Sequence, residues 1–251
     1  MSLFSRKKKL IVSGCSYTDD YATTQNLKPF PLWPELLAEK LDMECINVGK
    51  VAFGNKAIYS TLIDQVVSQK NVGLAISMWS EFQRVSFYMG EGNLPKGIDE
   101  KMLWSCFHPD RDYLEGEWHD QFYDDAEKNP SKKDYVYKVS KVIRENGLGG
   151  MKGGTYDSIR MMYSFQTICE SLDIPHLQVQ GCIPIMSKTG NRGQKELCHY
   201  ILDSCYFDKI NKKTFLGWPI MPQISGTNID YHLDLIDPDR TTLRISSEDV
   251  H

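Results

Sequence analysis

Strand-like and helix-like patterns alternate along the first eighty residues of the chain. The segments 10–12, 45–48 and 73–79 are short runs rich in apolar residues, which is typical of buried strands. Within 34–41 and 56–67, apolar residues recur every three or four positions, which predicts two helices. This alternation indicates βαβ units and therefore an α/β fold with a mostly parallel sheet.

The alternation stops between residues 86 and 150. This stretch is rich in aromatic and charged residues without a repeated pattern, and we interpret it as an insertion that contains some helix. Glycines within 147–154 then predict a flexible junction. Beyond the junction, the pattern predicts helices at 156–171 and 194–205, a strand at 176–180 and a loop at 214–222. The length of 251 residues suits one domain carrying this insertion, which we assign to residues 1–251.

The overall composition excludes several classes of protein. Hydrophobic residues make up 41% and charged residues 25% of the chain, as in ordinary globular proteins. No apolar run approaches the roughly 18 residues that a membrane-spanning helix needs. The formal net charge of -4 provides no general attraction to nucleic acid. We therefore expect neither a membrane nor a nucleic-acid partner.

The cysteines and the N-terminal residues favour a cytoplasmic location. The seven cysteines are an odd number, are widely scattered and form no CxxC pair, so we expect reduced thiols. Lys7, Lys8 and Lys9 precede only three apolar residues, too few for the core of a secretion signal.

Histidines and carboxylates in the insertion raise the question of a metal site. His108 and Asp110 lie close together in the sequence, as do His119 and Asp120, with further acidic residues after them. Their spacing fits no standard set of metal ligands. We therefore interpret them as a solvated acidic loop and expect no metal.

Residues 14–18, Gly-Cys-Ser-Tyr-Thr, form the first segment with candidate chemistry. They follow the first predicted strand, and in open parallel sheets functional sites form at the carboxyl ends of strands. Ser16 would be exposed there, where a neighbouring base can activate its hydroxyl as a nucleophile. The alternative is that Ser16 is only a polar residue in a turn.

Residues 49–55, Gly-Lys-Val-Ala-Phe-Gly-Asn, form the second segment and lie between a predicted strand and a predicted helix. Glycine lets a backbone N–H face a ligand, and the start of a helix offers further donors, which suits an oxyanion hole. One alternative is a plain turn with Asn55 as the helix cap. Another is a phosphate-binding loop, since Gly49 and Gly54 have that spacing, although Asn55 stands where the motif has lysine.

Together, these two segments resemble the SGNH hydrolases, also called GDSL-like esterases, and in particular their divergent phage and bacterial members. The first block of that family places a nucleophilic serine just after the first strand, as Ser16 is placed here. Its second block supplies an oxyanion-hole glycine, which Gly54 followed by Asn55 matches. Its last block contains an Asp and a His, matched by residues 247–251, Ser-Glu-Asp-Val-His. The resemblance implies a flavodoxin-like, three-layer α/β/α sandwich.

The chain departs from the family pattern in the first and third blocks. Cys15 stands where the family usually has Asp before the serine. The stretch 77–81 lacks the asparagine that serves the family as another oxyanion donor. Ser80 or a backbone N–H would have to take its place.

Two histidines are candidates for the base. His251 follows Asp249 by two positions and Glu248 by three, and either carboxylate is a candidate to orient the imidazole. The alternative base is His232, which follows Asp230 by two positions.

The resemblance implies hydrolysis of an O-acyl ester, such as an acetylated sugar. Ser16 would attack the acyl carbon, and His251 would take its proton and later protonate the leaving alcohol. The backbone N–H groups of Ser16 and Gly54 would stabilise the oxyanion, with Asn55 or Ser80 nearby. No metal or organic cofactor is required.

Three further residues, Tyr17, Trp79 and Arg84, are expected to contact the substrate. Arg84 would anchor an anionic or sugar-bearing substrate, with a surface ion pair as the alternative. Residues 86–150 directly follow the third predicted strand, and we expect them to cap the carboxyl edge of the sheet and shape the pocket.

Two other functions fit the sequence. One is a carbohydrate-binding or structural protein of the same fold without turnover, which the missing asparagine favours. The other is a nucleotide- or phosphate-binding α/β protein that uses residues 49–55, against which the absence of the P-loop lysine argues.

Overall fold

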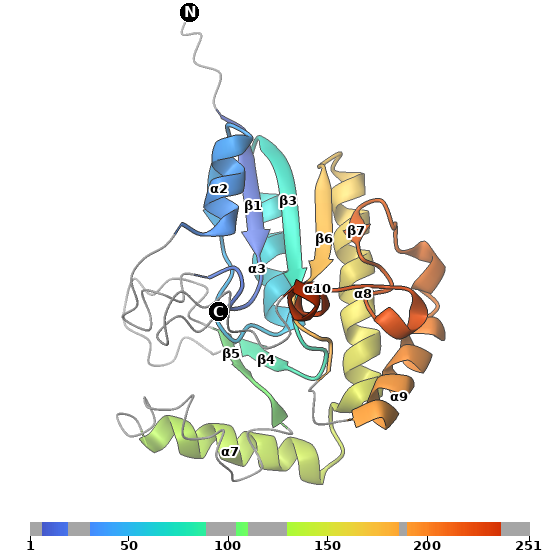
Figure 1. The fold of residues 1–251 in the computed structure, drawn as a ribbon. Coiled ribbons are helices and arrows are strands. Elements are labelled where there is room, and N and C mark those ends of the chain that lie inside the picture. The colour runs from blue at the N-terminus through green and yellow to red at the C-terminus, as the bar shows by residue number, and fades with distance from the viewer. Residues whose placement is uncertain (1–6, 20–30, 89–103, 110–129, 186–189, 237–251) are drawn as a thin grey trace, which may run out of the picture.

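A five-stranded parallel sheet forms the centre of the computed structural model, which describes residues 7–19, 31–88, 104–109, 130–185 and 190–236 (Figure 1). The strand order is β2-β1-β3-β6-β7, and each neighbouring pair is parallel. The strands are β1 (Lys9–Ser13), β2 (Glu44–Asn47), β3 (Val72–Trp79), β6 (His176–Gln180) and β7 (Phe215–Leu216). The predicted α/β fold with a mostly parallel sheet is therefore confirmed.

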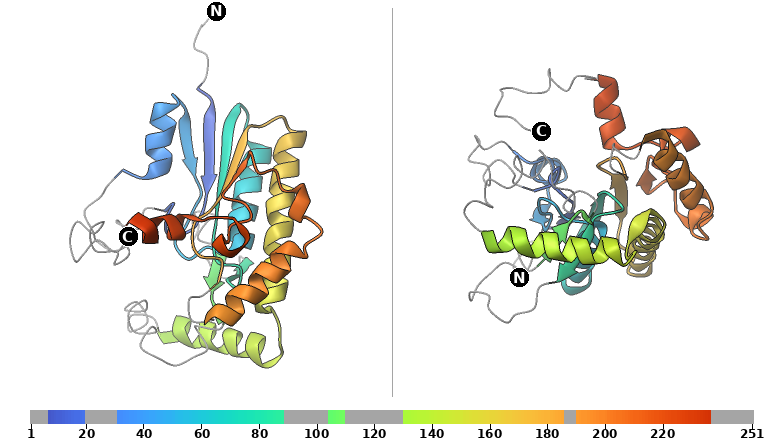
Figure 2. Two further views of the ribbon diagram at one scale, coloured as in Figure 1. Left: turned by 45° about the vertical axis from the view of Figure 1, so that its right-hand side comes forward. Right: turned by 90° about the horizontal axis from the view of Figure 1, so that it is seen from below.

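Helices lie on both faces of this sheet, as a three-layer arrangement requires (Figure 2). Alternate residues of β1 point to opposite faces. Ile11 packs with α3 and α8, whereas Leu10 and Val12 pack against Ala38 of α2. The helices are α2 (Trp33–Lys40), α3 (Asn55–Ser68), α7 (Pro130–Glu145), α8 (Gly150–Ser171), α9 (Gly190–Leu202) and α10 (Ile229–Ile236).

Residues 86–150 contain the helix α7, which confirms that this stretch includes some helix, and two paired strands that the sequence pattern did not predict. β4 (Val85–Tyr88) and β5 (Trp104–Phe107) form an antiparallel pair, and Ile143 of α7 packs against Val85 of β4. These elements lie beyond the carboxyl ends of the central strands (Figure 1). The pairing of β4 with β5 joins segments separated by residues 89–103, which is why no local periodicity indicated it.

Three other predictions differ from the structure. The glycine-rich junction is in part helical, because α8 begins at Gly150 rather than near residue 156. The loop predicted at 214–222 contains the short strand β7, which pairs with Gln178 and Val179. Helix α10 was not predicted at all.

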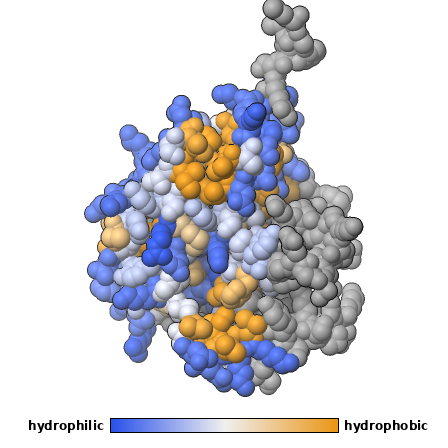
Figure 3. Space-filling view, turned by 180° about the vertical axis from the view of Figure 1, so that it is seen from behind, coloured by the Kyte–Doolittle hydropathy of each residue, from blue (hydrophilic) through white to orange (hydrophobic). Residues whose placement is uncertain are grey.

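The side of the molecule opposite the view of Figure 1 carries two apolar patches separated by polar side chains (Figure 3). Exposed Val67 and Leu172 lie at the carboxyl ends of α3 and α8. None of the helices in the described ranges is long and apolar enough to cross a bilayer.

Candidate functional site

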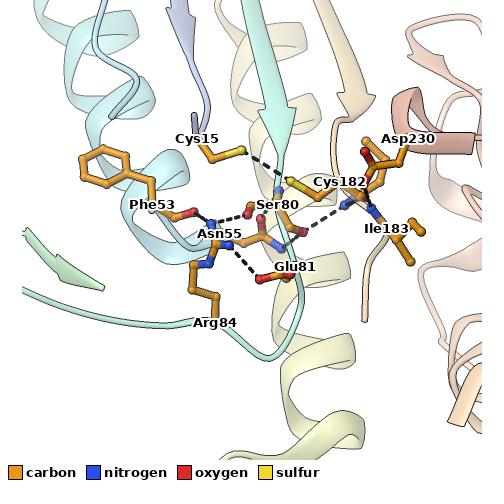
Figure 4. Close-up of polar contacts among 10 residues, drawn as sticks. Cys15, Phe53, Asn55, Ser80, Glu81, Arg84, Cys182, Ile183 and Asp230 are labelled. Carbon is orange, nitrogen blue, oxygen red and sulfur yellow. Dashed lines mark hydrogen bonds and ion pairs between the residues drawn. The ribbon is translucent and has the colours of Figure 1, made fainter. Parts of the chain in front are cut away.

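The strand order fixes where a ligand site is expected. The chain passes from β1 to β2 on one side and then to β3 on the other, so the direction of winding reverses between β1 and β3. In such sheets, ligands bind at the carboxyl ends of the strands at this reversal. The segments that follow β1, β3 and β6 come together there (Figure 4).

Ser16 lies in the tight turn after β1, as the sequence predicted. The N–H groups of Thr18 and Asp19 both donate to the carbonyl oxygen of Cys15, at 2.9 and 3.2 Å, which closes the turn. Gly14 is required because a Cβ there would lie 2.2 Å from Thr18 Oγ1. Ser16 is half-buried, and neither its hydroxyl nor its backbone N–H donates to a residue in the described ranges.

Gly54 immediately precedes α3 and packs closely against the loop after β3. A Cβ at this position would lie 2.7 Å from the carbonyl oxygen of Arg84 and 2.7 Å from Ser86 Oγ. The Gly54 N–H faces the Cys106 thiol, and its hydrogen bond partly offsets the burial that raises the pKa of Cys106. The backbone donor expected in the oxyanion hole therefore points at a sulfur of β5.

The Asn55 side chain joins three elements. Its Oδ1 accepts from the Ser80 N–H at 2.8 Å, and its Nδ2 donates to Ser158 Oγ at 2.9 Å and to the Ser80 carbonyl at 3.3 Å. Asn55 is 2% exposed. Both amide hydrogens are used internally, so the side chain is a structural tie rather than an oxyanion donor. It is not the helix cap either, because Gly54 occupies that position.

Arg84 lies across the site as an internal brace. Its Nη1 donates to Ser80 Oγ at 2.9 Å and to the Phe53 carbonyl at 3.1 Å, and its Nη2 pairs with Glu81 at 2.7 Å. Burial alone would lower the pKa of Arg84, but the Glu81 carboxylate and negative charge on the sulfurs of Cys182 and Cys15 raise it overall. Its ion pair is thus internal to the site, not the surface pair that was the alternative.

Trp79 and Tyr17 also make internal contacts. Trp79 is fully buried, donates from Nε1 to Gln178 Oε1 at 2.9 Å and packs edge-on against Phe165. It is therefore a core residue, which corrects the expectation that it contacts substrate. Half-buried Tyr17 donates its hydroxyl to Asp230 Oδ1 at 2.5 Å.

The expected base, His251, lies outside the described residues, and so do its two carboxylate candidates, Glu248 and Asp249. The alternative base, His232, is described: its Nε2 lies 2.9 Å from Thr227 Oγ1. The Asp230 carboxylate accepts from the Tyr17 hydroxyl and from the Ile183 N–H, the latter at 2.7 Å.

A pair of thiols at the centre of the site was missed by sequence reasoning. Cys15 Sγ lies 3.6 Å from Cys182 Sγ (Figure 4). The hydrogen bond from Cys182 lowers the pKa of Cys15 to about 6 against the effect of burial, with help from Arg84, the Tyr17 N–H and Ser80. The same pairing and burial raise the pKa of Cys182. The available signal was that each cysteine lies two residues beyond the end of a strand, β1 or β6.

No cluster of three or more histidine, cysteine or acidic side chains that could hold a metal occurs in the described ranges. His108 is fully buried, and Asp110, His119 and Asp120 fall outside those ranges. Comparison of the chain with family models, with curated proteins and with solved structures finds no match.

Proposed function

We propose that this protein is a serine esterase of the SGNH type that hydrolyses an O-acyl ester. The observation that carries the proposal is the state of Ser16: its hydroxyl and its N–H are both unused by described residues at the reversal point of the sheet. A nucleophile and an oxyanion donor on one residue are what acyl transfer needs. The resemblance of the residues around Ser16 and Gly54 to that family adds independent support.

In the proposed reaction, Ser16 Oγ attacks the acyl carbon and its proton passes to His251, oriented by Glu248 or Asp249. The Ser16 N–H stabilises the tetrahedral oxyanion. The protonated imidazole then gives its proton to the leaving alcohol. A water molecule hydrolyses the acyl-enzyme by the same route in reverse, which restores the serine.

A carbohydrate ester is the proposed substrate class. Phe87 and Tyr88 of β4 are 40% and 51% exposed beyond the carboxyl edge of the sheet, and aromatic rings of this kind can pack against a sugar. We further propose that residues 86–150 cap the site. All seven cysteines are free thiols, which supports a role in the reducing cytoplasm.

A fluorophosphonate probe tests the proposal without knowledge of the substrate, because it reacts with an activated serine. We expect an adduct on Ser16, located by peptide mass spectrometry, that is lost in Ser16→Ala and in denatured protein. Ser171→Ala, at an exposed helical serine, is the matched control and should label normally. Loss of the adduct in His251→Ala but not in His232→Ala would assign the base. A folded chain without an adduct on Ser16 would refute the proposal.

A non-catalytic carbohydrate-binding protein is the second candidate. It is favoured by the internal use of two expected oxyanion donors, the Gly54 N–H and the Asn55 amide. It predicts sugar binding that survives Ser16→Ala, with no adduct. The phosphate-loop alternative has less support, because the Val51 N–H in that loop already donates to the Asp19 carboxylate at 2.9 Å.

A further inference from the structure

Cys15 follows β1 and Cys182 follows β6. Their thiols meet beyond the end of β3, which lies between those two strands. β1 and β6 flank β3, and the loops that follow them approach each other beside Ser80. The two sulfurs are 3.6 Å apart, whereas a disulfide bond is about 2.05 Å long. An approach of roughly 1.5 Å would therefore join them.

The surroundings of this pair favour a reactive sulfur rather than an inert one. The Arg84 guanidinium, the Tyr17 N–H and the Ser80 hydroxyl all stabilise negative charge on Cys15. A thiolate, not a thiol, is the nucleophile in disulfide formation. Cys169 provides the contrast within the same chain, because burial without such partners raises its pKa to about 12.

Access to the pair is through Cys182. Cys15 is fully buried, but Cys182 is partly exposed. We propose that Cys15 and Cys182 form a reversible dithiol–disulfide pair, oxidised by a hydroperoxide that enters past Cys182, at a position next to Ser16. Cys15, whose negative charge Arg84 and Ser80 stabilise, is the attacking sulfur and Cys182 the resolving one.

The proposed oxidation proceeds in two balanced steps. The Cys15 thiolate attacks an oxygen of the hydroperoxide. The O–O bond breaks, the departing oxygen takes up a proton from solvent and leaves as an alcohol or water, and Cys15 becomes a sulfenic acid. The Cys182 sulfur then attacks the Cys15 sulfur while the Cys182 proton passes to the departing hydroxyl. The S–O bond breaks, water leaves, and the two cysteines have lost two electrons to one hydroperoxide.

The consequence for activity rests on the proposed function. Closing the gap would draw the turn that carries Ser16 towards the loop after β6, because Ser16 directly follows Cys15. A displacement of about 1 Å can cost a reaction about 100-fold in rate. We therefore expect the disulfide to slow labelling of Ser16 by the fluorophosphonate probe at least about tenfold.

Peptide mass mapping of the full chain after treatment with hydrogen peroxide tests the inference, with probe labelling measured on the same samples. The expected result is a cross-link between the Cys15 and Cys182 peptides that a dithiol reductant removes, with full recovery of labelling. Cys205→Ser, at the exposed cysteine, is the matched control and should retain the cross-link. Cys182→Ser should lose the cross-link.

The outcomes separate the two proposals. Peroxide-treated protein in which the two peptides stay separate, or in which Cys15 is oxidised to a sulfinic acid instead, overturns the dithiol assignment. A complete cross-link with unchanged labelling of Ser16 overturns its effect on activity. Absence of labelling even in the reduced protein refutes the esterase proposal. The presence or absence of the cross-link then still tests the proposed dithiol–disulfide pair.

Discussion

The ion pair between Glu81 and Arg84 is nearly removed from solvent, with side chains 18% and 11% exposed. Removing one member of such a pair leaves the other charge without compensation, which costs about 3 kcal/mol or more. We expect Glu81→Gln to lower the free energy of unfolding by about this amount in urea titrations. Asp157→Asn breaks an exposed pair with Arg160 and should have far less effect. Equal losses in the two variants would contradict the bracing role of Arg84.

The Cys15 thiolate makes stability depend on pH. Its pKa is lowered to about 6, chiefly by Cys182, whereas that of an unfolded cysteine is about 8.5. At a pH between these two pKa values, Cys15 holds a proton in the unfolded chain that it has lost in the folded chain. The stability that the Cys15 thiolate contributes therefore grows as pH rises and disappears as pH falls through about 6. In reducing buffer, the stability lost in Cys15→Ser should be about 1–2 kcal/mol larger at pH 8 than at pH 6. A loss that is equal or smaller at pH 8 would show that the thiolate does not form.

At the scale of elements, two adjacent glycines of α8 have opposite roles. A Cβ at Gly154 would lie 2.2 Å from the Phe82 carbonyl oxygen, whereas one at Gly153 would meet no atom within 4 Å. We expect Gly153→Ala to raise the free energy of unfolding by up to about 1 kcal/mol through helix propensity. Gly154→Ala should lower it by about 1–3 kcal/mol, because α8 must move away from the loop after β3. Thermal unfolding of both variants checks this, and stabilisation by Gly154→Ala would contradict the close approach.

Local patterns predicted the elements whose signals lie within one segment, and they missed those that depend on distant pairing. The runs that became β1, β3 and β6 were recognised, as was the turn holding Ser16, because each is defined by its immediate neighbours. The apolar run that predicted β3 includes Trp79. Because successive strand residues point to opposite faces, Trp79 lies with Ala75 in the core rather than at the site.

The contacts within the site were beyond the reach of local reasoning. Cys15 and Cys182 are neighbours only because the sheet order brings the ends of β1 and β6 to one edge. Asn55 was predicted to be a cap or an oxyanion donor, since nothing in the sequence indicated that Ser80 and Ser158 would use its amide.

At the scale of the whole molecule, the pairing of β3 with β6 governs how the chain can fold during its synthesis. Ala75 pairs with His176, about a hundred residues later. Before β6 emerges from the ribosome, β1, β2 and β3 can assemble, but the outer edge of β3 has no partner. An unpaired apolar edge is a template for aggregation. Because translation adds about 5–20 residues per second, this edge stays open for on the order of ten seconds. The risk of edge-to-edge association is therefore greatest while the insertion and α8 are being translated.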